Sequence, residues 1–184
     1  MRQAFISAFT VLGLVTASLS AQAGWDPTKG EKEVKAAQET IAAFKKKDPS
    51  IKAFFDKAYG YAVFPTIGKG GFIVGGAHGK GIVYKQGVIV GRASMSQGTF
   101  GAQIGGQSFS EVIFFGTKDA FDRFTQSKLE FAAQATAVAA NEGAGANADY
   151  HEGVAIFTMV KGGLMAEAAI GGQKFKFTPT SKKK

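Results

Sequence analysis

The sequence predicts an α+β fold, in which a curved, mostly antiparallel and glycine-rich sheet approaches a half-barrel and N-terminal helices pack on it. Two observations predict this fold. Apolar residues recur at helical spacing between positions 31 and 58, and from Tyr59 onward they gather in short β-branched and aromatic runs bounded by glycine. Fifteen glycines between 60 and 116 lie among these runs, and glycines inside strands permit the bends and close backbone approaches of a strongly curved sheet.

Two helices are expected before the sheet. The first covers 31–47, and its apolar face is formed by Val34, Ala37, Ile41 and Phe44. Asp48 then suits an N-cap, and Pro49 suits the first position of a second, short helix. A third short helix is expected at 117–126, with Thr117 as its N-cap.

Strand-like segments fill most of the chain after the second helix. The first is expected to end at Pro65, because proline cannot donate a hydrogen bond to a neighbouring strand. The residues IVYKQGVIV at 82–90 predict a hairpin, with Gly87 at the positive φ that such a turn requires. The segment 129–140 is ambiguous, since its alanines favour a helix while its apolar residues alternate as in a half-buried strand; the strand is preferred. Two or three strands are expected to close the chain.

The strand-like region also repeats two short motifs. KGGF at 69–72 returns as KGGL at 161–164, and IGGQSF at 104–109 returns as IGGQKF at 170–175. These repeats predict two similar hairpin units within one sheet.

The stretch KGGFIVGGAHGKG at 69–81 has the composition of a phosphate-binding loop but not its spacing. A P-loop places serine or threonine directly after its lysine, whereas Gly81 follows Lys80 here. A dinucleotide-binding loop opens a helix after a strand, whereas these residues lead into another strand-like segment. Both kinds of nucleotide site are excluded on this basis, and the glycines are interpreted as structural.

Residues 1–23 have the composition of a signal peptide. Arg2 precedes an apolar core at 4–19, and the small residues of AQA at 21–23 suit a cleavage site. The expected product begins with a lead-in at 24–34 and is a periplasmic or secreted protein, soluble or peripherally associated with a membrane. Cysteine does not occur in the sequence, so disulfide bonds are excluded.

The chain is basic, with a formal net charge of +8 at pH 7. The segment 61–110 holds four basic residues and no carboxylate, and the segment from 151 onward holds six basic residues against two carboxylates. Basic surfaces bind anionic partners, and for an exported protein an anionic phospholipid or membrane surface is expected rather than nucleic acid. The candidate lipid-binding residues, at the end of the first helix and in the strand-like region, are Lys45, Lys46, Lys47, Lys69, Lys80, Lys85, Arg92, Lys161, Lys174 and Lys176.

Several of these segments together resemble the SYLF domain, a lipid-binding module. The resemblance rests on AYGYAVFPTIGKGGFIVGGAHGKGIVY at 58–84, on VGRASMSQGTFGAQIGGQSFSEVIFF at 90–115 and on KGGLMAEAAIGGQKF at 161–175. It covers roughly 35–178, with a basic tail at 179–184, and it implies phospholipid binding without catalysis. Eukaryotic relatives bind phosphoinositides and in some cases actin, whereas for an exported protein the resemblance implies binding of anionic lipid and no contact with actin. An apolar cleft inside the bent sheet is an additional candidate for lipid contact.

Two other classes of function remain open. A hydrolase or metalloenzyme would centre on His78 or His151, the two histidines of the chain, with Ser94 or Ser96 as a nucleophile or Glu111 as an acid–base group. The serines have no G-x-S-x-G context. Asp149 and Glu152 lie near His151, but no second cluster of ligands completes a metal site. No catalytic residue, metal or cofactor is therefore expected. The other alternative is a structural protein of the cell envelope that binds the cell wall or another protein.

Overall fold

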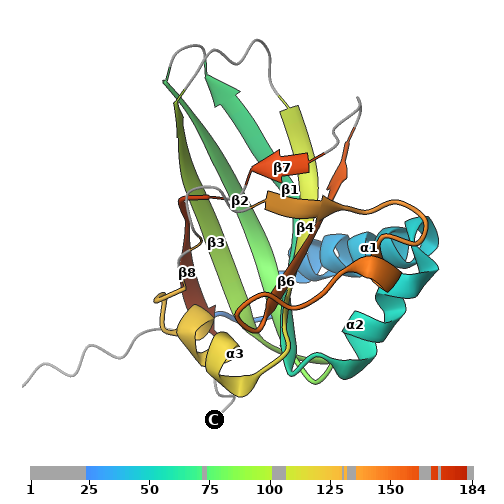
Figure 1. Ribbon diagram of the computed structural model, residues 1–184. Coiled ribbons are helices and arrows are strands. Elements are labelled where there is room, and N and C mark those ends of the chain that lie inside the picture. The colour runs from blue at the N-terminus through green and yellow to red at the C-terminus, as the bar shows by residue number, and fades with distance from the viewer. Residues whose placement is uncertain are drawn as a thin grey trace, which may run out of the picture.

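The computed structural model describes residues 24–71, 74–100, 107–129, 131, 136–161, 167–169 and 171–181, and at 69–71, 74–75, 99–100, 107, 136 and 167–169 it describes the backbone alone (Figure 1). The helices are α1 (Glu31–Lys47), α2 (Lys52–Lys57) and α3 (Lys118–Thr125), with short 3-10 helices η1 (Pro49–Ile51) and η2 (Gly145–Asn147). The strands are β1 (Gly60–Gly71), β2 (Val74–Lys85), β3 (Val88–Phe100), β4 (Gln107–Phe115), β5 (Thr136–Ala139), β6 (Val154–Val160), β7 (Glu167–Ala169) and β8 (Gln173–Pro179).

The strands form one eight-stranded sheet in the order β7-β5-β6-β4-β1-β2-β3-β8. β5 pairs with β6 in parallel, and the other pairings between these strands are antiparallel. The sheet curls strongly. The ring centroids of Phe64 on β1 and Phe175 on β8 are 5.9 Å apart, although β2 and β3 lie between those two strands in the sheet, and only a curled sheet brings them this close. The curl is open, with β7 and β8 at its edges. The predicted α+β fold with a curved, mostly antiparallel sheet is therefore confirmed.

α1 and α2 cover the outer, convex face of the sheet (Figure 1). The predicted apolar face of α1 is the face that docks, since Ala37 and Phe44 are buried and Val34 and Ile41 pack against the same cluster. The sheet residues in this cluster include Tyr61, Val63, Ile82, Tyr84, Val112, Phe114 and Phe157. The apolar stripe of α1 therefore belongs to the protein core.

Asp48 turns the chain between α1 and α2. Its carboxylate accepts hydrogen bonds from the backbone N–H groups of Ser50 at 3.0 Å, Gly143 at 3.2 Å and Gly145 at 2.6 Å. Burial acts to raise the pKa of Asp48, but these bonds and one from the Ser50 hydroxyl outweigh it and lower that pKa. The predicted N-cap, with Pro49 at the first position, is confirmed, although it begins the 3-10 helix η1 that leads into α2.

α3 covers part of the inner, concave face. Phe121 and Phe124 of this helix are buried there, and the ring centroid of Phe124 lies 5.2 Å from that of Phe175 on β8. Phe64, Phe109 and Phe115 of the sheet fill the same cluster. The described side chains of this cluster fill the space inside the curl. The apolar cleft expected there stays a prediction.

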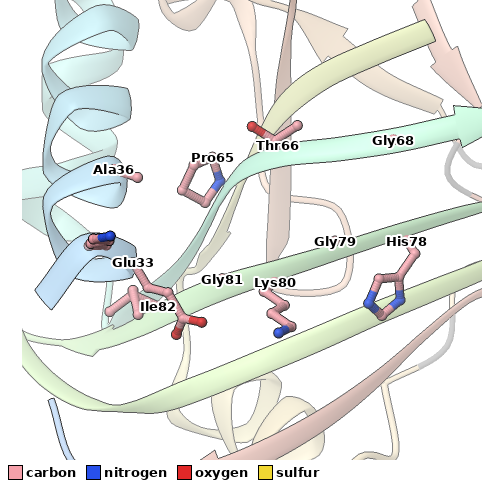
Figure 2. A pocket seen from close by; sticks show the side chains of 11 residues that line it. Glu33, Ala36, Pro65, Thr66, Gly68, His78, Gly79, Lys80, Gly81 and Ile82 are labelled. Carbon is pink, nitrogen blue, oxygen red and sulfur yellow. The ribbon is translucent and has the colours of Figure 1, made fainter. Parts of the chain in front are cut away.

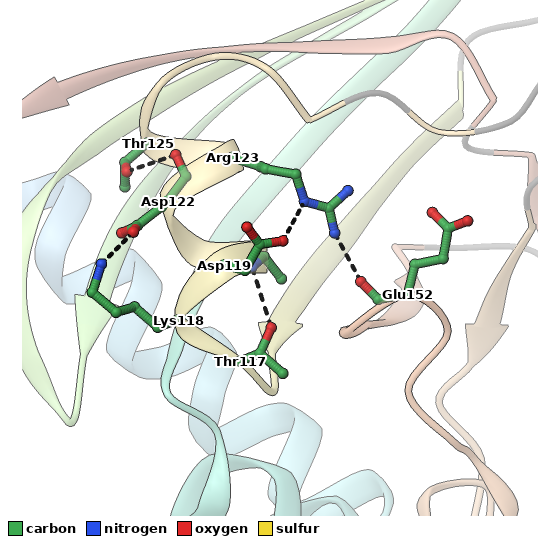
Figure 3. A network of polar contacts seen from close by, with 8 residues as sticks. Thr117, Lys118, Asp119, Asp122, Arg123, Thr125 and Glu152 are labelled. Carbon is green, nitrogen blue, oxygen red and sulfur yellow. Dashed lines mark hydrogen bonds and ion pairs between the residues drawn. The ribbon is translucent and has the colours of Figure 1, made fainter.

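Polar contacts fix α3 at both of its ends (Figure 3). Thr117 caps the helix, as predicted, by accepting a hydrogen bond from the Ala120 N–H at 3.2 Å. Nε of Arg123 lies 3.2 Å from the Asp119 carboxylate, and Nη2 donates to the Glu152 carbonyl at 2.9 Å. Arg123 therefore links the helix to the turn before β6.

The first strand does not end at Pro65. β1 continues to Gly71, and its pairing with both neighbouring strands shifts register beside the proline. Proline lacks an N–H, and a bulge lets a strand pass it without losing a ladder hydrogen bond. The Pro65 carbonyl accepts a hydrogen bond from the Ser110 hydroxyl at 2.8 Å. The predicted strand end is therefore wrong, because an irregular register accommodates the proline.

One other local prediction is confirmed, and a second is confirmed for part of its segment. The hairpin between β2 and β3 turns at Gln86 and Gly87, whose φ angles are 49° and 79°. In the ambiguous segment 129–140, the residues 136–139 form the strand β5. Residues 130 and 132–135 of that segment lie outside the described residues.

The repeated motifs lie in different surroundings. The first KGG motif leads from β1 into β2, and these two strands form an antiparallel hairpin. After Lys161, by contrast, the next strand β7 pairs with β5 rather than with β6. The predicted second hairpin unit is therefore wrong for these described strands. The IGGQ repeats do share a place, since Gln107 begins β4 and Gln173 begins β8.

Several glycines of the sheet serve close packing, as the sequence predicted. A Cβ at Gly81 would lie 2.7 Å from the Val63 carbonyl oxygen and 2.8 Å from the ring of Phe64. A Cβ at Gly91 would lie 2.4 Å from the carbonyl oxygen of Thr178. A side chain at either position would force its strand away from a neighbouring backbone.

The lead-in and the end of β8 lie side by side. Trp25 N–H donates to the Pro179 carbonyl at 2.7 Å, and Ser181 N–H donates to the Trp25 carbonyl at 2.8 Å. The expected signal peptide at 1–23 and the tail residues 182–184 lie outside the described residues. In the part of the chain that the structure describes, no helix is long and apolar enough to cross a membrane.

Candidate functional site

Three of the candidate lysines meet on the outer face of the sheet. Side chains alternate between the two faces of a strand, and Lys80 on β2 shares the outer face with Lys174 and Lys176 on β8. Two cross-strand rows run over β2, β3 and β8, and they are Lys80–Ser94–Lys176 and His78–Ser96–Lys174. Adjacent strands lie about 4.8 Å apart, so each row places a hydroxyl between two basic side chains whose backbones are about 10 Å apart.

A fourth lysine reaches this face from a distant part of the chain. Lys161 follows β6, and its Nζ donates a hydrogen bond to Oγ1 of Thr66 at 2.7 Å. Thr66 is the cross-strand partner of Lys80 on β1, so Lys161 extends the Lys80 row by one strand. We name Lys80, Lys161, Lys174 and Lys176 the cationic face, and all four residues are exposed.

The strands beneath the cationic face carry no opposing charge. The sequences of β1, β2, β3 and β8 contain neither aspartate nor glutamate. The four strands therefore contribute only positive charge to this side of the sheet.

Arg92 lies at the margin of the cationic face. It pairs across the strands with Ile82 on β2 and Thr178 on β8, one row beyond Lys80. The hollow beside it has a volume of about 650 Å³, and its lining includes three carboxylate residues, Asp26, Glu31 and Glu33. Lys29 and Lys32 line the same hollow, so Arg92 lies in surroundings of mixed charge.

The three lysines at the end of α1 lie away from the cationic face. Lys45, Lys46 and Lys47 form the last turn of α1, where positive charge complements the helix dipole. Nζ of Lys45 is 4.8 Å from the centre of the Phe55 ring in α2. A helix rises about 1.5 Å per residue, so Lys46 is about 15 Å along the axis from Ala36, which shares a groove with Lys80.

Two further candidates are placed elsewhere. Lys85 follows Lys80 by five residues on β2 and therefore alternates to the opposite face, where its Nζ is 5.0 Å from the centre of the Tyr59 ring. The backbone of Lys69 lies in β1 opposite Ala77, and its side chain is outside the described part of the structure. The structure thus unites four of the ten candidates, with Arg92 beside them.

A groove of about 450 Å³ separates the start of α1 from the outer face of β1 and β2 (Figure 2). Six of its eleven lining residues have no polar side chain, namely Ala36, Pro65, Gly68, Gly79, Gly81 and Ile82. Lys32 of α1 and His78 and Lys80 of β2 also line it. The groove therefore combines an apolar lining with basic side chains.

The residues of the enzyme alternative do not form a catalytic triad. His78 and Ser96 are cross-strand partners on the outer face, but no strand under that face supplies a carboxylate to orient the imidazole. His151 lies in the turn before β6, apart from them. Among the described residues, no three His, Cys, Asp or Glu side chains are grouped so that they could hold a metal ion.

Glu111, the acid–base candidate, is fully buried on the inner face. Its Oε2 accepts a hydrogen bond from Nε2 of Gln173 at 3.0 Å, and its Oε1 has no hydrogen-bond partner among the described residues. Burial raises the pKa of Glu111 to about 7, against the opposing effect of the Gln173 hydrogen bond. Because His78 is on the outer face, these two groups do not form a catalytic pair.

Sequence reasoning missed the Thr66 hydroxyl, and it considered Ser94 and Ser96 only as nucleophiles and not as neighbours of the lysines. Strand alternation was the available signal, because it groups residues two apart and separates Lys80 from Lys85. No local signal brings Lys161 to Thr66, since 95 positions separate them and strand order alone makes them neighbours.

Comparisons with known proteins extend these observations. The model of the family described as "Las17-binding protein actin regulator" matches residues 96–183, from β3 through β8. "Beta cell expansion factor A" of Aeromonas veronii is 36% identical to this chain over 129 residues, which are 69% of this chain and 49% of that relative. The chain thus spans about half the length of this curated relative.

Proposed function

Because the chain belongs to the SYLF-domain family, a family of binding modules, we propose that it is a non-catalytic protein that binds anionic phospholipid membranes through the cationic face. The observation that carries this proposal is the meeting of Lys80, Lys161, Lys174 and Lys176 on one exposed side of the sheet. These residues come from β2, β8 and the segment after β6, so the fold and not the local sequence assembles them.

Four lysines suffice for reversible attachment to a membrane. Each lysine near an anionic membrane contributes about 1 kcal/mol, so the cationic face contributes about 4 kcal/mol, or about a thousandfold in the partition constant. The Ser94 hydroxyl lies between Lys80 and Lys176, and the Ser96 hydroxyl lies beside Lys174. Both can donate hydrogen bonds to phosphate oxygens. Because the lysines are exposed, salt screens this attraction strongly.

Co-sedimentation with vesicles tests the proposal. We expect the purified protein to sediment with phosphatidylglycerol vesicles at low salt and to be released as the salt concentration rises. Phosphatidylcholine vesicles, which are zwitterionic, should leave it in the supernatant. Equal sedimentation on both vesicles, or no sedimentation at low salt, would contradict binding by charge.

The proposal includes export from the cytoplasm, in keeping with the signal-peptide composition of residues 1–23. In that case the protein acts in the periplasm or outside the cell. Cell fractionation followed by N-terminal sequencing tests this step. Gly24 as the first residue of a periplasmic or secreted form is expected, and an intact Met1 in the cytoplasmic fraction would refute export.

The absence of catalysis is also part of the proposal, and it rests on the family and on the separation of His78, His151 and Glu111. A protein with both histidines changed to alanine should still bind phosphatidylglycerol vesicles at low salt, because the four lysines of the cationic face remain. Retention on cell-wall sacculi, together with no binding to vesicles, would favour a structural role in the envelope instead.

A further inference from the structure

The floor of the groove beside α1 lacks a side chain at one outward-facing strand position. Gly68 of β1 lies in it, and a Cβ at Gly68 would meet no heavy atom within 4 Å. A Cβ at Gly79 would lie 2.7 Å from Cγ1 of Ile67, and a Cβ at Gly81 would lie 2.7 Å from the Val63 carbonyl oxygen. Gly79 and Gly81 are therefore explained by close packing on the inner face, whereas at Gly68 the space toward the groove is free.

The groove has the size and the lining of a site for a small apolar group. Its volume of about 450 Å³ lies within the range of about 300–1,000 Å³ that is typical of small-ligand sites. Figure 2 shows Ala36 on α1 and Pro65 and Ile82 on the neighbouring strands. These apolar side chains can pack against a hydrocarbon chain, and they cannot form hydrogen bonds with a polar ligand.

Basic side chains and one carboxylate line this apolar space. The basic side chains that line the groove belong to Lys32, His78 and Lys80. The Thr66 hydroxyl, which also lines the groove, holds Nζ of Lys161 at 2.7 Å. Glu33 is the one carboxylate residue among the lining residues. An amphiphile with an acidic headgroup fits this combination of charge and apolar surface.

We propose that the groove holds the hydrocarbon chain of one anionic, single-chain amphiphile, while the acidic headgroup binds Lys80 and Lys161. This inference rests on the proposed function and deepens it, because it names a lipid that the protein takes up as a monomer. The basic side chains select an anionic headgroup, and the volume of the groove, at the lower end of the small-ligand range, selects a single chain.

Calorimetric titration with lauroyl-lysophosphatidylglycerol, kept below its critical micelle concentration, tests the groove. We expect the whole protein to bind one molecule per chain. Gly68→Leu fills the floor and should weaken this binding by about tenfold or more, and tenfold corresponds to about 1.4 kcal/mol. Glycerol phosphate, which has the headgroup charge without the chain, should bind far more weakly than the amphiphile.

Gly98→Leu is the matched control. Gly98 is on the same outer face, on β3, and a Cβ there would also meet nothing within 4 Å, but it does not line the groove. We expect its affinity for the amphiphile to equal that of the wild type. Should circular dichroism show that Gly68→Leu is unfolded, Ala36→Leu narrows the groove from the helix side and takes its place, with the same expected loss.

Two results would overturn the groove site. One is the absence of monomer binding by the wild type, and the other is equal affinity in the wild type and the folded groove-filling variant. Salt-sensitive sedimentation with phosphatidylglycerol vesicles would in either case leave the proposed function standing. Monomer binding without vesicle binding would instead refute attachment to membranes while supporting the groove.

Discussion

Gln173 donates a hydrogen bond of 3.0 Å to the Glu111 carboxylate across the inside of the sheet. Their strands, β8 and β4, are separated by β1, β2 and β3 in the sheet order, so the bond requires the curl. Gln97 on β3 similarly donates to the Gly171 carbonyl, just before β8, at 2.9 Å. Side-chain amides therefore hold the start of β8, the strand that carries two lysines of the cationic face, against the inside of the curl.

The buried carboxyl of Glu111 makes stability depend on pH. Its pKa is raised from 4.5 to about 7 in the folded protein, so its contribution to stability is fully present below about pH 4.5 and is lost as the pH rises through about 7. Between pH 5 and pH 8 we expect this group to lower the free energy of unfolding by about 2–3 kcal/mol. Glu111→Gln should lack that loss, as measured by urea unfolding at both pH values.

Glu142→Gln provides the control for this pH effect. Glu142 is exposed in the turn that precedes η2, and its substitution should leave the pH dependence of the wild type unchanged. Identical pH dependence in the wild type and in Glu111→Gln would show that the Glu111 carboxyl is not responsible.

Asp48 joins the corner between α1 and α2 to the loop at 143–145. Asp48→Ala removes an acceptor from three backbone N–H groups, and each unsatisfied buried donor costs about 1–3 kcal/mol. We expect a loss of about 2–4 kcal/mol, because water satisfies some of these donors after the change. Thermal and urea unfolding measure this loss. Asp56→Ala is the control, since that carboxylate is exposed and pairs with Lys52 on the surface; a similar loss in both variants would refute the role given to Asp48.

The glycines of the sheet are not equivalent. Gly81→Ala places a methyl group against the Val63 carbonyl and the Phe64 ring, and overpacking of this kind costs about 1–3 kcal/mol. Gly98→Ala meets nothing and should change stability by about 0.5 kcal/mol or less. Comparison of the two urea midpoints tests this difference, which would be absent if the glycines served the bend of the backbone alone.

Local sequence patterns predicted which helices and strands form better than they predicted which strands lie side by side in the sheet. The spacing of Val34, Ala37, Ile41 and Phe44 predicted both α1 and the face that it buries, because a helical period determines which side chains share a side. Pro65 misled the prediction of β1, since a register shift on both sides of the strand depends on β2 and β4, which a local pattern does not contain.

The residues of the candidate site were predicted only in part, because a local pattern does not show which strands are neighbours. Residues two apart on a strand, such as Lys174 and Lys176, share a face in any strand order. The approach of Lys161 to Thr66, by contrast, depends on the pairing of β4 with both β1 and β6. Basic composition alone also included Lys46 and Lys85, which lie elsewhere, because charge in the sequence carries no information about which side of the fold it occupies.

Charge reversal at matched positions tests the central claim most directly. Lys174→Glu with Lys176→Glu changes the cationic face, and Lys46→Glu with Lys47→Glu changes the net charge equally at exposed positions at the end of α1. On phosphatidylglycerol vesicles at low salt, we expect the first pair to lower the partition constant about a hundredfold or more and the second about fivefold or less. Equal losses in the two proteins would show that net charge, and not the cationic face, drives binding.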